Sequence, residues 1–251
     1  MDSLYYREYY KLERNHWFFQ VRAKIIMTHI ESILEKNGSC KILNIGPATG
    51  YTSELLEKYG EVLSVEYDNE CYEFVKEKLD IKIIQGTILD LDFEDNSYDL
   101  VCAFDVIEHV EDDQLAVDEM KRVCNNDGFV VVTVPAFQSL WSKHDEINHH
   151  FRRYKKKPLL NLFNDKDGIE YNTYFNFFLF LPIALIRIIS YRILRKRFNK
   201  NEEQTGSDLE IGNSSFVSKI MYFIFSMELP FIRKRLKLPF GVSLLVSWKK
   251  K

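Results

Sequence analysis

The stretch "ILNIGPATG" at residues 42–50 constrains this chain more than any other part of the sequence. An apolar run ends there abruptly in small residues and a proline. A short apolar run bounded by glycine is typical of a buried strand. Glycine also permits backbone angles and close approaches that other residues do not. We therefore predict a buried strand that ends in a tight turn, with a ligand close to the backbone of that turn.

Short apolar runs then alternate with helical patterns. The expected strands cover residues 41–45, 62–66, 82–84, 100–104, 129–134, 169–175 and 243–249, and the expected helices cover 3–36, 52–59, 70–78 and 112–123. Strands separated by helices of this length imply a parallel sheet with right-handed crossovers. The fold class is therefore α/β.

Composition excludes several classes of protein. The net charge is −3 over 251 residues, which gives no sign of a nucleic-acid partner. The four cysteines are far apart and form no C-x-x-C pair, so we expect neither disulfides nor a zinc site. Charges in "MDSLYYREYYKLERNHW" interrupt the apolar core that a signal peptide requires. We expect a cytoplasmic protein.

Two ligand classes compete for the turn at Gly46–Gly50. In open α/β sheets, ligands lie outside the carboxyl ends of the strands. A dinucleotide site requires G-x-G-x-x-G, and here Ala48 and Tyr51 occupy two of its positions. A G-x-x-x-G turn suits an adenosyl ligand without phosphates. Glu66, at the end of the next strand, can accept both ribose hydroxyls of either ligand class. A turn with no ligand is the third alternative.

Four segments in sequence order carry a family resemblance: "ILNIGPATG", "VLSVEYD", "IIQGTILDLDFEDNSYDLVCAFDVIEHV" and "MKRVCNNDGFVVVTVPA". Together they resemble the class I S-adenosylmethionine-dependent methyltransferases of types 11 and 12, over residues 41–136 and 243–249. The resemblance implies a Rossmann-like, seven-stranded, mostly parallel sheet with an antiparallel last strand. It also implies S-adenosyl-L-methionine as cofactor and S-adenosyl-L-homocysteine as product. "NHWFFQVRAKII" and "LWSKHDEINHHFRRY" resemble a bacterial branch that is often associated with cell-surface saccharide pathways.

The resemblance also assigns the cofactor site. The implied contacts are Asn44, Gly46, Ala48, Gly50, Glu66, Tyr67, Gly86, Thr87, Ile88, Phe104 and Asp105. Three of these depart from the family pattern. Asn44 and Thr87 stand where the family usually has acids, and Ala48 replaces the middle glycine. A hydroxyl at Thr87 bonds the adenine amine less strongly than a carboxylate does.

Candidate catalytic residues lie near the expected ligand edge. His109 follows the fourth strand, and His144 and Asp145 lie in the loop after the fifth strand. Either histidine can act as general base toward a hydroxyl acceptor, or can shape the pocket structurally. His149 and His150 with His144 match no strong zinc signature, so we expect no metal.

Candidate acceptor contacts come from the N-terminal helix and from the loop after the fifth strand. They are Trp17, Arg22, Arg152, Arg153 and Tyr154. Arginine offers a bidentate fork for a phosphate or carboxylate. A solvated basic loop and ordinary packing of the helix are the alternatives.

An apolar insertion separates the last two strands. Residues 171–186 contain no charge, but the run is shorter than the roughly 20 residues of a membrane span and contains Pro182. The basic apolar segment from Arg187 to Arg197 can lie in a membrane interface or pair with residues 216–227. The insertion can instead form a helical cap or a homodimer face that buries these side chains within protein, and we favour the cap.

We therefore expect a single domain over 1–251. It has an N-terminal helical lid (1–38), a Rossmann-like core (39–176 and 238–251) and a C-terminal helical insertion (177–237). The expected reaction is O-methylation of a small-molecule, saccharide or lipid-linked acceptor. We expect the insertion to form a helical cap, and peripheral contact to the inner membrane face through 177–227 is the alternative. The alternatives are a scaffold that keeps the fold without catalysis and a nicotinamide-dependent oxidoreductase.

Overall fold

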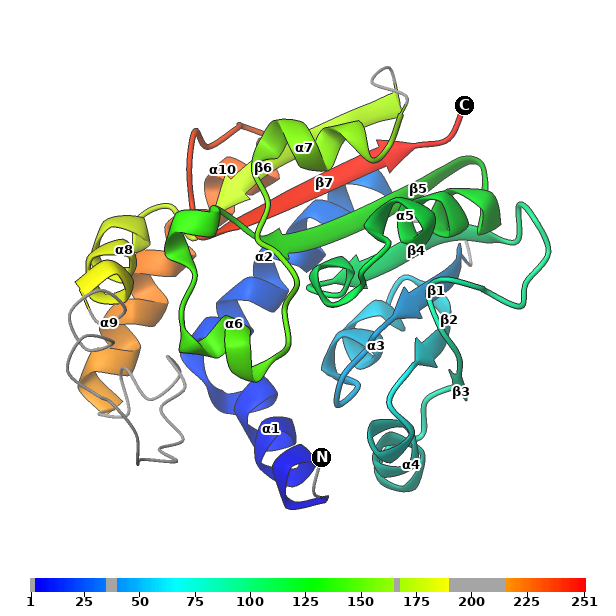
Figure 1. Cartoon of the computed structure of the whole chain (residues 1–251), viewed down its shortest axis with the longest axis horizontal. Helices are drawn as coiled ribbons and strands as arrows, with labels where there is room; N and C mark the ends of the chain where they lie inside the picture. Colours follow the sequence, from blue (N-terminus) through cyan, green and yellow to red (C-terminus); the bar gives the residue numbers. More distant parts are fainter. Residues whose placement is uncertain (1–2, 35–39, 165–167, 190–214) are drawn as a thin grey trace.

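A computed structural model describes residues 3–34, 40–164, 168–189 and 215–251 (Figure 1). Within these residues the strands form one seven-stranded sheet in the order β3-β2-β1-β4-β5-β7-β6. The strands are β1 (Cys40–Ile45), β2 (Gly60–Glu66), β3 (Ile83–Gln85), β4 (Tyr98–Phe104), β5 (Cys124–Pro135), β6 (Ile169–Phe175) and β7 (Ser243–Lys249). Strand β7 lies antiparallel between β5 and β6, and β1 to β5 pair in parallel. The predicted fold class is confirmed.

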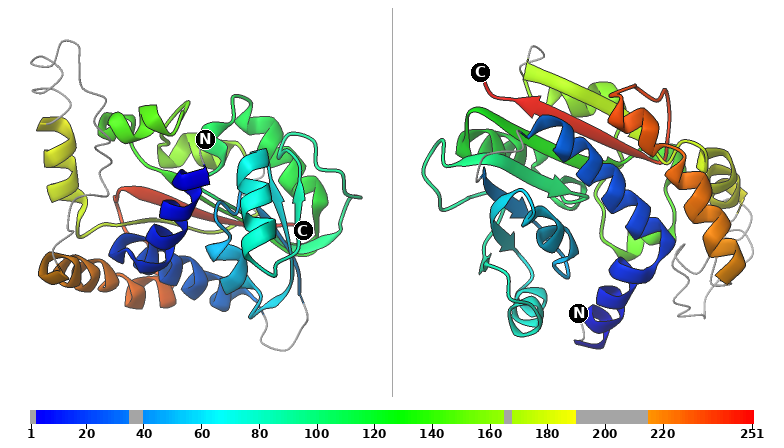
Figure 2. Two further views of the ribbon diagram at one scale, coloured as in Figure 1. Left: turned by 90° about the horizontal axis from the view of Figure 1, so that it is seen from below. Right: turned by 180° about the vertical axis from the view of Figure 1, so that it is seen from behind.

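The central strands are apolar because helices cover both faces of the sheet (Figure 2). Val101 and Ala103 of β4 pack in one core with α5 and α7, whereas Leu100 and Cys102 pack in another with α2 and α3. Alternate residues of β4 therefore pack against the helices on opposite faces of the sheet.

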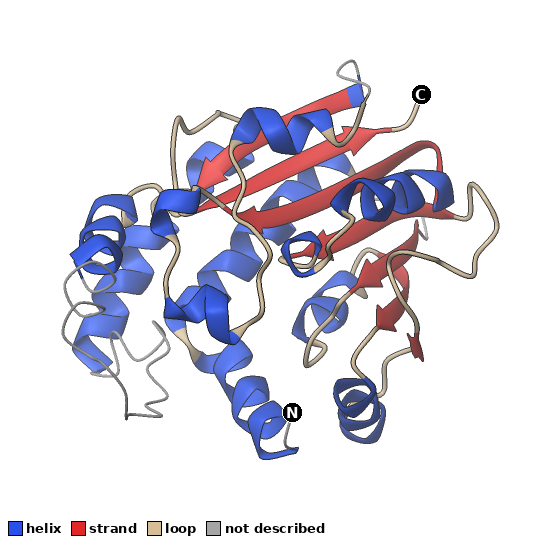
Figure 3. Ribbon diagram, viewed as in Figure 1, coloured by secondary structure: helices blue, strands red, loops and turns tan. Residues whose placement is uncertain are grey.

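The helices connect and cover the strands (Figure 3). They are α1 (Ser3–Asn15), α2 (Trp17–Ile33), α3 (Tyr51–Leu56), α4 (Asn69–Lys78), α5 (Asp113–Val123), α6 (Lys143–Ile147), α7 (Lys156–Asn161), α8 (Phe180–Ile189), α9 (Ser215–Ser226) and α10 (Leu229–Arg233), with 3-10 turns η1 (Ile107–His109) and η2 (Gln138–Leu140). The first and last strands and the α4 and α5 helices lie within two residues of the predicted positions.

The expected single helix over 3–36 is wrong, because the chain breaks at His16. This residue has an extended backbone, with φ −77° and ψ 134°. Its Nδ1 accepts a hydrogen bond from the Phe18 N–H at 3.3 Å and so caps α2. The break directs α1 toward the glycine turn while α2 packs on the sheet.

The insertion between β6 and β7 is fixed to the core by Glu228. This carboxylate is fully buried and accepts hydrogen bonds from the backbone N–H groups of Asn176, Phe177 and Phe178, at 2.7, 2.7 and 3.2 Å. Burial raises the pKa of Glu228 to about 7. No helix in the described ranges is long and apolar enough to cross a membrane. The basic positions at 190–197 lie outside those ranges.

Candidate functional site

The turn after β1 has a left-handed backbone at three positions. The φ angles are +62° at Gly46, +49° at Ala48 and +86° at Gly50. A Cβ on Gly46 would lie 2.7 Å from Val106 Cγ2, and one on Gly50 would lie 2.5 Å from Leu79 Cδ1. Both glycines are therefore required by backbone angle and by packing within the protein. Ala48 has a left-handed backbone angle as well, although it is not a glycine.

Replacing Gly46 with alanine is expected to lower the free energy of unfolding by about 2 kcal/mol or more. The left-handed angle costs an L-residue about 1–2 kcal/mol, and the new methyl group displaces Val106. Urea denaturation followed by circular dichroism measures the change. Ala48→Gly is the matched control, because it relieves a left-handed angle and should be neutral or stabilising by up to about 1 kcal/mol. Equal losses in the two variants would contradict this explanation.

Asn44 is bonded within the protein. Its side chain is 1% exposed, and its Nδ2 donates hydrogen bonds to Thr52 Oγ1 at 3.0 Å and Ser53 Oγ at 2.9 Å. These bonds tie β1 to the start of α3. The departure from the family's acid therefore leaves a side chain that holds the turn in place. A direct contact between Asn44 and a cofactor remains a proposal.

Glu66 ends β2 next to the glycine turn. Its side chain is largely buried, and Oε1 accepts a hydrogen bond from the Asp68 N–H at 3.0 Å. Burial raises the pKa of this carboxyl to about 7, although hydrogen bonds from the backbone of Asp68, Tyr67 and Ala48 act in the opposite direction. The link to Ala48 joins the acid directly to the turn. This pairing suits an adenosyl ligand, whose ribose hydroxyls need an acceptor close to the turn.

Only some of the residues expected to contact the adenine ring are free to do so. Tyr67 is 78% exposed, so its ring is free to cover a ligand. The Thr87 oxygen accepts a hydrogen bond from the Leu89 N–H at 3.2 Å, and Ile88 is buried in the core. Gly86 packs against Val65 and donates its N–H to Glu66 O. The proposed adenine contacts therefore rest mainly on Tyr67 and on the backbone of this turn.

Helix α1 covers the glycine turn. Glu13 is buried and accepts a hydrogen bond from the Thr49 hydroxyl. Arg14 donates to the Thr49 carbonyl at 3.3 Å and pairs with Glu54. The Tyr6 hydroxyl donates to Asp68 at 2.8 Å. These contacts give the proposed lid a physical basis, because each one joins α1 to residues around the expected cofactor.

Arg22 is paired within the protein. Its Nη2 lies 2.8 Å from Asp105 Oδ2, and the Thr133 hydroxyl donates to Asp105 Oδ1 at 3.0 Å. Asp105 follows β4 with a left-handed φ of +59°, and Phe104 before it is buried in the core. The ion pair fixes α2 to the carboxyl end of β4. Arg22 is therefore better described as positioning Asp105 than as clamping an acceptor.

The loop after β5 is built around Asp145, which is fully buried. Its carboxylate accepts hydrogen bonds from Arg153 Nε at 2.7 Å and the Ser142 N–H at 2.8 Å, and its Oδ1 lies 2.8 Å from His150 Nδ1. The three partners hold the pKa of Asp145 far below its usual range, against the effect of burial. This enclosure gives no support to the prediction that Asp145 acts on an acceptor.

Carboxylates of the protein also bind three neighbouring side chains of this loop, Arg152, Arg153 and Tyr154. Arg152 pairs with Asp113 at 2.8 Å, and the Tyr154 hydroxyl donates to the same carboxylate at 2.7 Å. The Arg153 side chain is 2% exposed. These side chains fasten the loop to α5 and α6, and their predicted contact with an acceptor stays a prediction.

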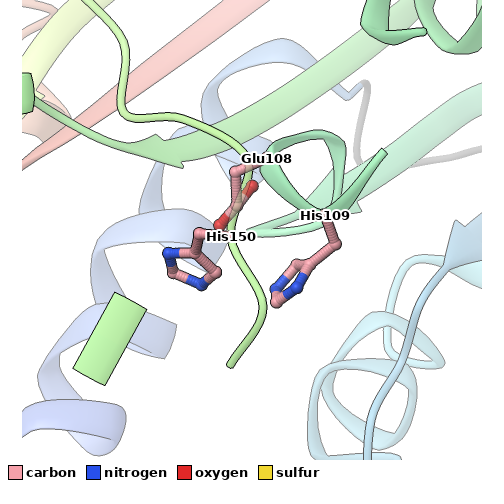
Figure 4. A group of neighbouring side chains, drawn as sticks. All are labelled: Glu108, His109 and His150. Carbon is pink, nitrogen blue, oxygen red and sulfur yellow. The ribbon is translucent and has the colours of Figure 1, made fainter. Parts of the chain in front are cut away.

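Three side chains converge beyond the end of β4 (Figure 4). The rings of His109 and His150 lie 4.5 Å apart between centroids, nearly perpendicular. Desolvation and the neighbouring His150 lower the pKa of His109.

Glu108 is fully buried beside these two histidines, and the sequence analysis did not select it. The sequence signal was an acid enclosed by apolar residues in "VIEHV". His144 lies further away, with its ring 6.1 Å from that of His150, and His149 is exposed.

Comparison with known proteins agrees with this geometry. Residues 43–132 match the family described as methyltransferase domain. They contain the glycine turn, Glu66, Glu108 and His109, whereas His150 lies outside the match. Residues 43–132 therefore form a methyltransferase domain, and the chain has the fold of the class I S-adenosylmethionine-dependent methyltransferases. A solved S-adenosylmethionine-dependent methyltransferase from Archaeoglobus fulgidus has the same fold, with a TM-score of 0.59, 15% identity and coverage of 98% of this chain and 100% of that one.

Two further proteins are similar to this chain. A demethylmenaquinone methyltransferase of Staphylococcus aureus is 31% identical over 116 residues, which are 41% of this chain and 48% of the relative. The chain thus spans about half the length of the curated relatives it matches. A putative sarcosine dimethylglycine methyltransferase from Galdieria sulphuraria has a TM-score of 0.54 at 16% identity, covering 92% of this chain and 83% of that one.

A groove of about 930 Å³ lies where α1 and α2 of the methyltransferase approach α9. Its lining includes Trp17, Gln20, Tyr222 and Phe223. Trp17 packs edge-on against Phe225 with 6.4 Å between ring centroids, and its indole N–H is buried without a hydrogen-bond partner among the described residues. Trp17 therefore lies where α2 approaches α9, and its contact with an acceptor stays a prediction.

Proposed function

We propose that this methyltransferase transfers the methyl group of S-adenosylmethionine to a hydroxyl oxygen of a small-molecule, saccharide or lipid-linked acceptor. The observation that carries the proposal is the buried Glu66 carboxylate joined to the left-handed turn at Gly46–Gly50. An adenosyl group needs a ribose acceptor and close approach of backbone at this edge of the sheet. The residues present fit that group.

In this proposal the cofactor, when bound, supplies a methyl group already activated on sulfur. The protein contributes alignment and a dry site. Glu66 holds the ribose, the Arg22–Asp105 pair fixes the end of β4, and α1 excludes water from the turn. His109 and His144 are the candidate acceptors of the hydroxyl proton.

The simplest test of the proposal is to detect the products of methyl transfer. Cells with and without the protein are compared by untargeted profiling of methylated compounds, and purified protein is then assayed for release of S-adenosylhomocysteine with the compounds that differ. We expect product release that depends on an acceptor and is lost in Glu66→Ala. Cofactor binding without any methylated product would favour the scaffold alternative.

We further propose that the acceptor is lipid-linked and that α8 and α9 contact the membrane surface. Large apolar side chains project from these helices: Leu181, Leu185, Phe216 and Phe223 are 66%, 59%, 74% and 68% exposed. Lys219 lies between the two phenylalanines on α9. Apolar residues with a nearby cation are typical of helices that lie in a membrane interface. The name of the demethylmenaquinone relative is compatible with an apolar acceptor.

Sedimentation with anionic phospholipid vesicles tests this contact. The double variant Phe216→Ser and Phe223→Ser is expected to lose at least tenfold in vesicle affinity, because two exposed phenyl groups no longer enter the interface. Phe151→Ser is the control, since Phe151 is also exposed but lies on the loop after β5. Equal vesicle binding by all proteins, or a homodimer in light scattering that the double variant abolishes, would contradict the membrane assignment.

A further inference from the structure

We propose that Glu108, His109 and His150 form a binding site for a divalent transition-metal ion. One ligand atom from each side chain lies within 4.8 Å of the other two. Glu108 and His109 belong to η1 directly after β4, and His150 comes from the loop after β5 (Figure 4). The Phe151 N–H donates to the Glu108 carbonyl at 2.8 Å and fixes the loop against η1. The fold thus builds this group from two distant segments.

The buried carboxylate of Glu108 is the strongest evidence for a bound cation. The residue is 0% exposed, and neither carboxylate oxygen accepts a hydrogen bond from another residue that the structure describes. A buried carboxylate without a partner costs several kcal/mol, so buried acids are normally paired or bind a metal. Two arginines whose charges act on Glu108 are engaged elsewhere: Arg22 pairs with Asp105, and Arg153 pairs with Asp145. A cation bound between Glu108 and the two imidazoles would compensate the burial of this carboxylate.

Both histidines are held as metal ligands usually are. His150 Nδ1 lies 2.8 Å from Asp145 Oδ1, which leaves Nε2 as the available ligand atom. Asp145 is itself fixed by Arg153 and Ser142. The His109 ring is hydrogen-bonded to the Asn148 backbone. A carboxylate or carbonyl behind each imidazole orients the ring and selects its tautomer, as in carboxylate–histidine–zinc triads. This assigns Asp145 and Arg153 a positioning role.

The donor set indicates the class of metal. Two imidazoles and one carboxylate suit zinc, iron, cobalt or manganese and leave coordination positions open. Ligand bonds of about 2.0–2.2 Å require the three atoms to approach closer than 4.8 Å. Side-chain rotation supplies this movement, because His109 lies at the exposed side of the group. The expectation from sequence that the chain has no metal site is replaced by this proposal.

The open positions give the ion a role that rests on the proposed methyl transfer. An acceptor hydroxyl bound there would lose its proton more readily, because a metal ion stabilises the alkoxide. The proton would pass to His144 or solvent. The oxygen lone pair would form the new O–CH₃ bond, and the S–CH₃ bond would break with its electrons remaining on sulfur. In this arrangement His109 is a ligand, and His144 is the remaining candidate base.

Metal titration of tag-free, chelator-treated protein tests the site without cofactor or acceptor. We expect one equivalent of Co²⁺ or Zn²⁺ to bind, with visible absorption bands for Co²⁺. Glu108→Gln and His109→Ala should each weaken binding at least tenfold, as loss of a direct ligand does. His149→Asn is the matched control. It removes a neighbouring, exposed histidine with a left-handed φ of +55°, which asparagine tolerates, and should bind like wild type.

Circular dichroism and thermal unfolding show whether each variant folds. If Glu108→Gln does not fold, the exposed His109→Ala variant decides the outcome. The proposal is overturned if folded wild-type protein binds no stoichiometric metal, or if His109→Ala binds metal as tightly as His149→Asn. Because no cofactor is present, these results are independent of whether the protein transfers methyl groups.

Discussion

Replacing Glu66 with alanine is expected to weaken S-adenosylhomocysteine binding at least tenfold. The carboxylate is the proposed acceptor of two ribose hydroxyls, and hydrogen bonds to a charged group contribute about 1.5–3 kcal/mol. Calorimetric titration at pH 8 measures the change, because the carboxyl is ionised above its raised pKa of about 7.

Glu61→Ala provides the control for this titration. Glu61 lies on the same strand, β2, but near its amino end and exposed to solvent, where it pairs with Lys82. Its removal should leave the affinity for S-adenosylhomocysteine unchanged. Glu66→Ala protein that folds normally and binds as tightly as wild type would refute the ribose assignment.

Replacing Asp145 with alanine is expected to lower the free energy of unfolding by about 3–5 kcal/mol. Loss of one member of a buried ion pair leaves the other charge buried without compensation. Here the Arg153 side chain, 2% exposed, would lose its carboxylate partner, and the Ser142 N–H and His150 would each lose a hydrogen bond to Asp145. Urea denaturation of the metal-free protein measures this loss separately from any effect of a bound ion.

Glu170→Ala is the comparison for Asp145→Ala. Glu170 also pairs with an arginine, Arg235 at 3.0 Å, but both side chains are partly exposed. Such pairs contribute about 0–1 kcal/mol. If Asp145→Ala destabilises the protein no more than Glu170→Ala does, the enclosed network around Asp145 is not what holds this loop.

The sheet could be predicted from sequence because parallel strands buried on both faces are continuous apolar runs. "DLVCAF" and "FVVVTV" have this character, and both form central strands. The antiparallel last strand came from the family resemblance. The break at His16 was not predictable by the same means, because no glycine or proline marks it. The structure shows it as an extended residue whose ring caps the next helix.

The candidate site was predictable where its residues follow strand ends. Gly46, Glu66 and Asp105 each occupy such a position, and the structure brings them to one edge of the sheet. The role of Arg153 was not predictable, because its partner Asp145 lies within the same polar loop and burial cannot be read from a run of basic residues. Glu108 was missed for a related reason: only the return of the loop to η1 shows that this acid is buried beside two histidines.

Isothermal titration of the purified wild-type protein with S-adenosylmethionine tests the central claim most directly. We predict one binding site with micromolar affinity, in competition with S-adenosylhomocysteine. Folded protein that takes up neither compound, with or without added divalent metal, would contradict the account.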